Sequence, residues 1–147
     1  MRLPGTLFTL GYQAHTTRTM LRVLQENEID LVVDVRQNPI SRKSGFSKAG
    51  LASILSDKGI GYHHYPCFGT PRRIRERYFK QGDVATALLE FEKYLRTRER
   101  CVKVFLNQVS AKKFCLVCYE SDHRSCHRSV VADKLAEIMK CQPIHLM

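Results

Sequence analysis

Two nearly continuous apolar runs, residues 29–35 and residues 113–120, most strongly constrain the fold of this chain. Only Asp30 and Asp34 interrupt the first run, and the second contains Phe114 to Val117 without a polar residue. An uninterrupted apolar run of this length is typical of a strand that is buried on both faces of a parallel sheet. We therefore expect a sheet that is covered by helices on both sides.

Weaker strand patterns and helical patterns alternate along the rest of the chain. Strands are predicted at residues 6–10, 60–65 and 143–146, and helices are predicted to begin at Thr16 or Thr17 and at Ser47. Further helices are expected in residues 68–100, in which one short and one longer helix fit, and at 128–140. Residues 102–109 fit a helix or a strand, and a helix is favoured. This alternation predicts parallel βαβ units. The expected fold is a three-layer α/β sandwich with a mostly parallel central sheet flanked by helices, which is Rossmann-like.

The 147 residues fit a single α/β domain spanning residues 1–147. The first residues lack the features of a signal peptide, and no apolar run reaches the roughly 18 residues of a membrane span. We expect a cytoplasmic protein that has no membrane partner and whose six cysteines are reduced, without a structural disulfide. Cys101, Cys115 and Cys141 are interpreted as small core residues.

The chain carries a net charge of +10, which favours an anionic partner, either nucleic acid or a phosphorylated small molecule. A generally basic, solvated surface is the alternative. Neither a Gly-x-Gly-x-x-Gly turn nor a phosphate-binding Gly-Lys-Ser/Thr loop is present, so the sequence identifies no cofactor. The oligomeric state is likewise left open.

Reactive side chains gather where the second apolar run ends and the last predicted helix begins. Cys118 and Glu120 are two residues apart and project to one face of a strand, and Cys126 and His127 start the helix. Burial would raise the pKa of Glu120 and suit it to acid or base catalysis, although Arg128 or His127 would oppose the shift. Alternatively, Glu120 fixes the helix start by hydrogen bonds. Either cysteine is a candidate nucleophile or an inert thiol.

Asp34 and Arg36 stand at the end of the first apolar run and are expected to point toward the same edge of the sheet as Glu120. Asp34 is a candidate second carboxylate, and Arg36, Ser41, Arg42 and Arg128 are candidate anion-binding residues. An Asp–Arg pair that only closes the end of the sheet is the structural alternative. His64 adds either a titratable group or a structural histidine.

Cys115-x-x-Cys118 with Cys126-His127 has the composition of a zinc site, but a knuckle on the first pair is unfavourable, because residues three apart on a strand project to opposite faces. We therefore assign no metal ligands. Four arginines close to two aromatic residues are candidates for binding nucleic acid. The alternative is that they form a solvated helix face. These arginines are Arg72, Arg73, Arg75 and Arg77.

Several motifs, in the same order along the chain, resemble those of the family called domain of unknown function 488. They are Thr9-Leu10-Gly11-Tyr12, Asp34-Val35-Arg36, Pro39-x-Ser41-Arg42, Tyr62-x-His64-x-Pro66-x-x-Gly69, Cys118-x-Glu120 and Cys126-His127-Arg128. The resemblance implies an α/β sandwich with a cluster like an active site, to which Gly11 and Tyr12 would contribute as substrate-binding positions. Tyr12 is a departure, since many members have histidine there.

We favour an enzyme that acts on a nucleotide, nucleobase or phosphorylated substrate by acid/base chemistry at this cluster. Glu120, Asp34, Cys118, Cys126 and His127 are its candidate catalytic residues. One alternative is a non-catalytic, basic nucleic-acid-binding module. The other is a thiol-dependent redox or sulfur-transfer protein.

Overall fold

The central sheet has five strands, and all of them are parallel. The computed structural model describes residues 5–109 and 112–147, so residues 1–4, where the sequence predicts no export signal, lie outside it. The strand order is β3-β2-β4-β1-β5. The strands are β1 (Thr6–Gly11), β2 (Leu31–Asp34), β3 (Gly61–His64), β4 (Lys113–Cys118) and β5 (Ile144–Leu146).

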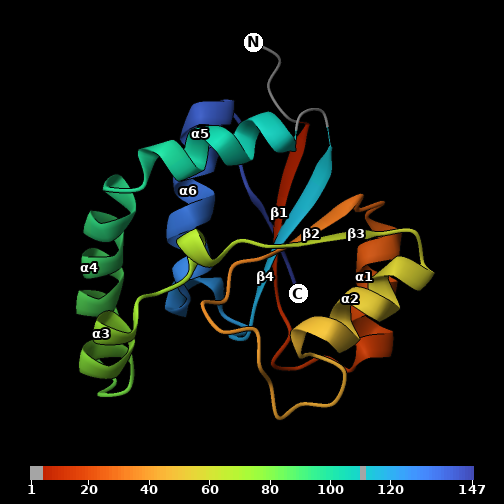
Figure 1. Cartoon of the computed structure of the whole chain (residues 1–147), viewed down its shortest axis with the longest axis horizontal. Coiled ribbons are helices and arrows are strands. Elements are labelled where there is room, and N and C mark those ends of the chain that lie inside the picture. The colour runs from red at the N-terminus through yellow and green to blue at the C-terminus, as the bar shows by residue number, and fades with distance from the viewer. Residues whose placement is uncertain (1–4, 110–111) are drawn as a thin grey trace.

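Helices cover both faces of this sheet (Figure 1). On one face lie α1 (Thr17–Glu26) and α2 (Lys48–Asp57), and on the other lie α4 (Val84–Arg96), α5 (Glu99–Gln108) and α6 (His127–Met139). Short helical turns complete the connections: η1 (Pro66–Phe68), α3 (Arg72–Ile74), η2 (Arg75–Phe79) and η3 (His123–Ser125). The predicted three-layer α/β sandwich is thus confirmed.

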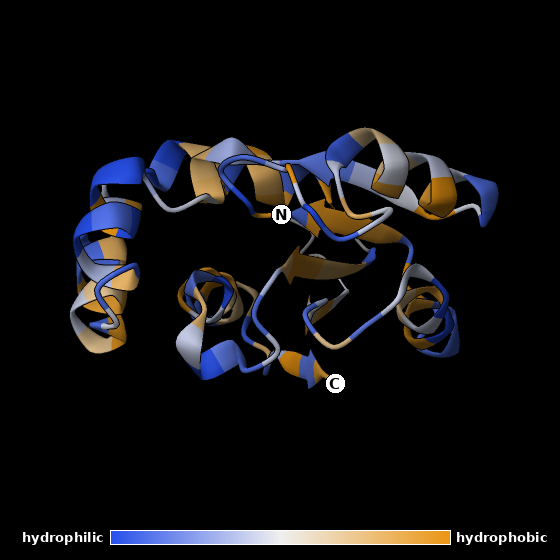
Figure 2. Ribbon diagram, turned by 90° about the horizontal axis from the view of Figure 1, so that it is seen from below, coloured by the Kyte–Doolittle hydropathy of each residue, from blue (hydrophilic) through white to orange (hydrophobic). Residues whose placement is uncertain are grey.

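The core divides into two apolar clusters, one on each face of the sheet. Along β4, Phe114, Leu116 and Cys118 pack against the α4–α6 side, whereas Cys115 and Val117 pack against the α1–α2 side. Burial of each large apolar side chain stabilises the fold by about 1.5–3 kcal/mol. Figure 2 shows the result, with mostly hydrophobic strands enclosed between the helices.

Helices α1 and α2 begin where the sequence predicts, but not every predicted N-cap residue makes a capping hydrogen bond. Thr16 caps α1 in a capping box with Thr19. Ser47 occupies the N-cap of α2, but its side chain makes no capping bond there and instead bonds the backbone of Ser41. The Sγ atom of Cys126 accepts a hydrogen bond from the Arg128 N–H and so caps α6.

Strand β4 ends at Cys118, two residues earlier than the sequence predicts, so Tyr119 and Glu120 begin a loop. The connections after β1 and β2 run over one face of the sheet and the connection after β4 runs over the other. In open α/β sheets, such a switch point opens a crevice at the carboxyl ends of the strands. Within the described part of the chain, no helix is long and apolar enough to cross a membrane.

Candidate functional site

A cavity of about 160 Å³ lies at the carboxyl ends of β2 and β4, closed by the segment 70–79 and the start of α6. Three of the five candidate catalytic residues line it, namely Cys118, Glu120 and His127. Pockets for drug-sized ligands measure roughly 300–1,000 Å³, so this cavity fits one group of a larger molecule or a very small one. The full lining is Arg36, Gln37, Asn38, Thr70, Arg75, Phe79, Cys118, Tyr119, Glu120 and His127.

Glu120 presents a carboxyl group to this cavity. Among the described residues, no cation lies within ion-pair distance of it, and its Oε2 atom lies 3.6 Å from the Sγ of Cys118. Burial raises the pKa of Glu120, while a backbone hydrogen bond and the charge of Arg128 oppose the rise. The carboxyl group therefore takes up a proton more readily than an exposed glutamate.

Arg128 is fully buried behind the cavity wall. Its Nη1 donates to the carbonyl of Glu120 and to the Sγ of Cys118, 3.2 Å away, and its Nη2 donates to the carbonyl of Ser121 at 3.3 Å. The Nε atom has no hydrogen-bond partner among the described residues. The guanidinium thus holds the loop after β4 against α6 and places a positive charge beside a thiol, an environment that favours the thiolate.

Cys118 and Cys126 face each other, and their Sγ atoms are in contact. This corrects the expectation that no cysteines pair. The two Cα atoms are 7.7 Å apart, whereas disulfides usually span about 4.4–6.8 Å. The backbone therefore brings the two sulfurs together at a spacing wider than a structural disulfide uses. The other four cysteines are free.

His127 follows Cys126 at the start of α6. Its Nε2 donates to the carbonyl of Val35 across 2.7 Å, which leaves Nδ1 without a proton and 3.8 Å from the Sγ of Cys126. The ring also packs edge-on against Phe91. Burial lowers the pKa of His127 to about 4, so the ring is neutral near pH 7.

Asp34 and Arg36 form a buried ion pair instead of facing the cavity together. The Asp34 carboxylate is fully buried and accepts from Nε and Nη2 of Arg36, at 2.8 and 2.6 Å, and from the hydroxyl of Tyr62 at 2.6 Å. Burial lowers the pKa of Arg36, but its interactions with Asp34 and Tyr12 together raise the pKa above its ordinary value. Asp34 therefore matches the alternative in which the Asp–Arg pair closes the end of the sheet, although Arg36 also lines the cavity.

Arg36 also organises residues that the sequence assigned to substrate binding. Its Nη1 donates to the hydroxyl of Tyr12 at 3.0 Å and to the carbonyl of Phe46 at 2.6 Å, and Tyr12 stacks on the Phe46 ring. The Nε2 of His64 donates to the carbonyl of Arg36 across 2.7 Å. Tyr12 and His64 therefore support Arg36 from outside the cavity.

Gly11, Ser41 and Arg42 also lie outside the cavity lining. A Cβ atom on Gly11 would stand 1.7 Å from the carbonyl oxygen of Glu120. Only glycine allows the end of β1 to approach the loop that carries Glu120 this closely. Ser41 hydrogen-bonds within its own loop, and Arg42 is exposed.

The four arginines of the segment 72–77 are divided by its helical geometry. Arg72 is paired with Glu76 at 2.9 Å, whereas Arg73 and Arg77 are exposed. Arg75 and Phe79 are four residues apart on the π-helix η2, and both line the cavity. Short π-helices are frequent at functional sites. The structure therefore adds Arg75 to the cavity and leaves Arg73 and Arg77 on the surface.

The sequence reasoning missed Gln37 and Thr70. The Oε1 atom of Gln37 and the Oγ1 atom of Thr70 are buried at the cavity wall without a hydrogen-bond partner in the described part of the chain. Gly69 brings them together, because a Cβ atom there would lie 2.5 Å from the Cα of Gln37. The available signal was Gly69 within the motif after β3, which indicates a close approach of two backbones.

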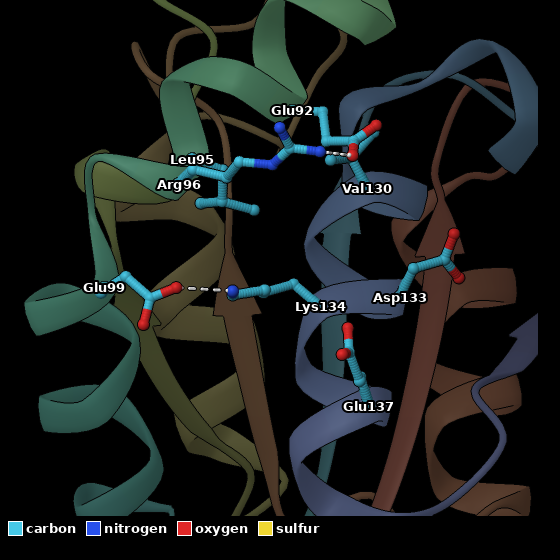
Figure 3. A pocket seen from close by; sticks show the side chains of 8 residues that line it. All are labelled: Glu92, Leu95, Arg96, Glu99, Val130, Asp133, Lys134 and Glu137. Carbon is cyan, nitrogen blue, oxygen red and sulfur yellow. Dashed lines mark hydrogen bonds and ion pairs between the residues drawn. The ribbon is translucent and has the colours of Figure 1, made fainter.

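A larger hollow, of about 590 Å³, lies between α4, α5 and α6. Figure 3 shows that two of its cations are already paired there, Arg96 with Glu92 and Lys134 with Glu99, each at 2.7 Å. It contains none of the buried polar atoms that lack a partner in the described residues. We therefore place the candidate site at the smaller cavity.

The family comparison agrees with the resemblance that the sequence motifs carry. A family model described as "Domain of unknown function DUF488" matches residues 16–135, which is most of the chain. Comparisons with curated proteins and with solved structures find no match. The matched range contains strands β2 to β4, the cavity lining and all five candidate catalytic residues. The chain therefore belongs to the DUF488 family.

Proposed function

We propose that this protein is an enzyme that acts on an anionic small molecule, such as a nucleotide or another phosphorylated compound, and binds one group of it in the cavity beside Glu120. The observation that carries the proposal is the pair of buried polar atoms, Gln37 Oε1 and Thr70 Oγ1, that lack a partner in the described residues. A buried polar group without a hydrogen bond costs about 1–3 kcal/mol, so such groups mark places where a ligand or water completes the bonding.

The charges around the cavity define the class of ligand. Arg75 lines the cavity and has no ion-pair partner in the described part of the chain, so it is available to a phosphate or carboxylate. A ligand that satisfies the Gln37 amide as well must carry N–H or O–H groups in addition to its anionic group. Nucleotides have both, and the aromatic ring of Phe79 offers a surface for a base.

Glu120 is the proposed catalytic group. Its carboxyl group lies at the cavity wall and is not engaged by a cation among the described residues, so it is free to exchange a proton with a bound ligand. Arg128 supports it through the Glu120 carbonyl and fixes the loop from which it projects. Asp34, fully engaged by Arg36 and Tyr62, is proposed to position Arg36 rather than to react.

The proposal is tested by a thermal-shift screen with nucleotides, nucleobases and phosphosugars. A ligand at about 100 times its Kd stabilises the native state by about 2.7 kcal/mol. Arg75→Ala and Thr70→Val should weaken binding of the stabilising ligand about tenfold or more, whereas Arg73→Ala, outside the cavity lining, should leave it unchanged. Glu120→Gln should retain binding and lose turnover. The absence of any stabilising ligand, or equal binding by all variants, contradicts the proposal.

Thiol chemistry at Cys118 and Cys126 is a second candidate function. It is favoured by the contact of the two Sγ atoms and by the 3.2 Å approach of Arg128 to Cys118. It requires that reduced Cys118, which lines the cavity, be alkylated in the native protein much faster than Cys115, which is equally buried but lies outside the cavity. Equal, slow alkylation of both contradicts it.

A further inference from the structure

We propose that Cys118, Cys126 and His127 bind one zinc ion at the wall of the cavity. The three side chains come from the end of β4 and the start of α6, and their ligand atoms all lie within 4.8 Å of one another. Two thiolates and one imidazole suit zinc, which prefers sulfur and nitrogen ligands. The sequence pattern contained these three residues but joined them with Cys115, which packs on the opposite face of the sheet.

The hydrogen bonding of His127 is that of a metal-binding histidine. A histidine that binds a metal through one ring nitrogen almost always donates its other N–H to a carboxylate, a carbonyl or water. His127 donates from Nε2 to the carbonyl of Val35 across 2.7 Å, so the lone pair of Nδ1 is free and lies on the side of Cys126. Apart from its 3.8 Å contact with the Sγ of Cys126, this nitrogen has no hydrogen-bond partner among the described residues.

The backbone spacing of the two cysteines fits a shared ion. Their Cα atoms are 7.7 Å apart, beyond the approximately 4.4–6.8 Å that a disulfide spans. Each Zn–S bond is about 2.3 Å long, so an ion placed between the sulfurs separates them further than a direct bond does. The two cysteines thus reach one ion without a rearrangement of β4 or α6.

The surrounding charges also permit a divalent ion. Two thiolates balance the charge of Zn²⁺, and the carboxylate of Glu120 then opposes the buried guanidinium of Arg128. Arg128 donates to the Sγ of Cys118 at 3.2 Å, the kind of supporting hydrogen bond that orients a metal ligand. Zn²⁺, two thiolates, one carboxylate and the buried guanidinium therefore sum to zero charge.

Three protein ligands leave the fourth zinc position open, as in catalytic zinc sites. Cys118, His127 and Glu120 all line the cavity, so this position faces the space proposed for the substrate. The binding of zinc stands on the geometry of its three ligands alone. Only its use, to hold a substrate oxygen or a water beside Glu120, rests on the proposed function.

The test is direct measurement of metal binding by the whole chain, purified with reductant and stripped of metal. Zinc should bind at about one ion per chain, and cobalt in its place should give sulfur-to-cobalt charge-transfer absorption with the d–d bands of a tetrahedral site. X-ray absorption of the zinc form should count two sulfur neighbours and one nitrogen neighbour from protein. These spectra use the unaltered protein, so they remain decisive even if a variant fails to fold.

Variants then assign the ligands. Cys118→Ser, Cys126→Ser and His127→Gln should each lower zinc affinity by more than the roughly 10–100-fold that loss of a supporting group costs. Cys141→Ser is the matched control, a half-buried thiol elsewhere in the chain, and should bind zinc as the wild type does. Failure of the reduced protein to take up zinc, sulfur-free cobalt spectra, or a metal-free disulfide between Cys118 and Cys126 overturns the proposal.

The outcomes separate this inference from the proposed function. Zinc binding without any stabilising nucleotide or phosphosugar supports the metal site and contradicts the anionic-substrate proposal. If a ligand stabilises the protein but added zinc does not bind to it, the result supports the proposed function and overturns the metal site.

Discussion

The guanidinium of Arg128 is fully buried and donates a hydrogen bond to the Sγ of Cys118 across 3.2 Å. The same group donates to the carbonyls of Glu120 and Ser121, so one side chain on α6 fixes the whole turn after β4. Among the described residues, no carboxylate lies within ion-pair distance of it. Its position is therefore maintained by backbone carbonyls and a sulfur atom, and it sets the geometry of the cavity from behind.

Arg128→Ala should lower the free energy of unfolding by about 3 kcal/mol or more, because it leaves two carbonyls without donors and opens a hole under the loop. Urea denaturation followed by circular dichroism measures this change. The control is Arg124→Ala, which removes an exposed arginine paired with Asp122 and should cost less than about 1 kcal/mol. Equal effects of the two substitutions would show that Arg128 does not hold the loop.

Gly11→Ala should destabilise the protein severely, since the new Cβ would stand 1.7 Å from the Glu120 carbonyl oxygen. The backbone of β1 or of the loop has to move, and overpacking of this kind typically costs about 1–3 kcal/mol or more. Gly50→Ala is a matched control on α2, where the nearest atom is 3.5 Å away and alanine should stabilise the helix by up to about 1 kcal/mol. Thermal denaturation of both variants tests the contrast, and an unchanged Gly11→Ala would disprove the close approach.

Asp34→Asn should cost about 3–5 kcal/mol of stability, because the buried guanidinium of Arg36 then loses its charged partner. Tyr62→Phe removes only one hydrogen bond to the same carboxylate and should cost about 1.5–3 kcal/mol. The double variant should cost less than the sum of the two single effects, since both act on one carboxylate. Strict additivity in urea denaturation would contradict the shared network.

The fold could be predicted from the sequence because its determinants are local. The apolar runs at 29–35 and 113–120 and the cap at Thr16 each depend on a few neighbouring residues. The placement of Cys118, Glu120 and His127 at one cavity also followed from parallel strands, whose carboxyl ends meet at one edge.

Contacts between distant segments could not be predicted in the same way. The sequence cannot show that Asp34 is enclosed by Tyr62, which depends on the pairing of β2 with β3. Nor can it show that Gly69 places Thr70 against Gln37, which depends on how the loops after β2 and β3 pack. The pairing of Cys118 with Cys126 was missed for the same reason. It depends on the path of the loop between them, which Arg128 fixes from α6.

Stability should fall at alkaline pH partly through Cys67. Burial and a hydrogen bond with Cys101 raise the pKa of Cys67 to about 12, whereas an unfolded cysteine ionises near pH 8.5. The unfolded chain therefore releases a proton that the folded chain keeps, so the contribution of Cys67 is complete below about pH 8.5 and is lost as the pH rises toward 12.

Urea midpoints between about pH 8 and pH 10.5 measure this fall in stability. Cys67→Ser should make the decline shallower without abolishing it, because burial also raises the pKa of Cys115. A decline that is equally steep in the variant and the wild type would remove Cys67 from the explanation.

Association with nucleic acid should involve Arg73 and Arg77 rather than all four arginines of the basic segment. Arg72 is exposed but engaged by Glu76, and Arg75 lines the cavity, so Arg73 and Arg77 are the exposed arginines of this segment without an ion-pair partner in the described part of the chain. The double variant Arg73→Ala/Arg77→Ala should weaken binding of a labelled single-stranded oligonucleotide. It should also reduce the slope of log K against log salt by about 0.7 for each phosphate group that the variant no longer neutralises.

Fluorescence anisotropy between about 50 and 200 mM salt measures both quantities. The control is Arg18→Ala combined with Arg22→Ala, because these two exposed arginines of α1 carry an equal charge on a helix on the other side of the sheet. If the double variant and the control change binding equally, the association depends on net charge alone. If the small-ligand thermal shift is also abolished in the double variant, the basic segment belongs to the cavity and not to a separate surface.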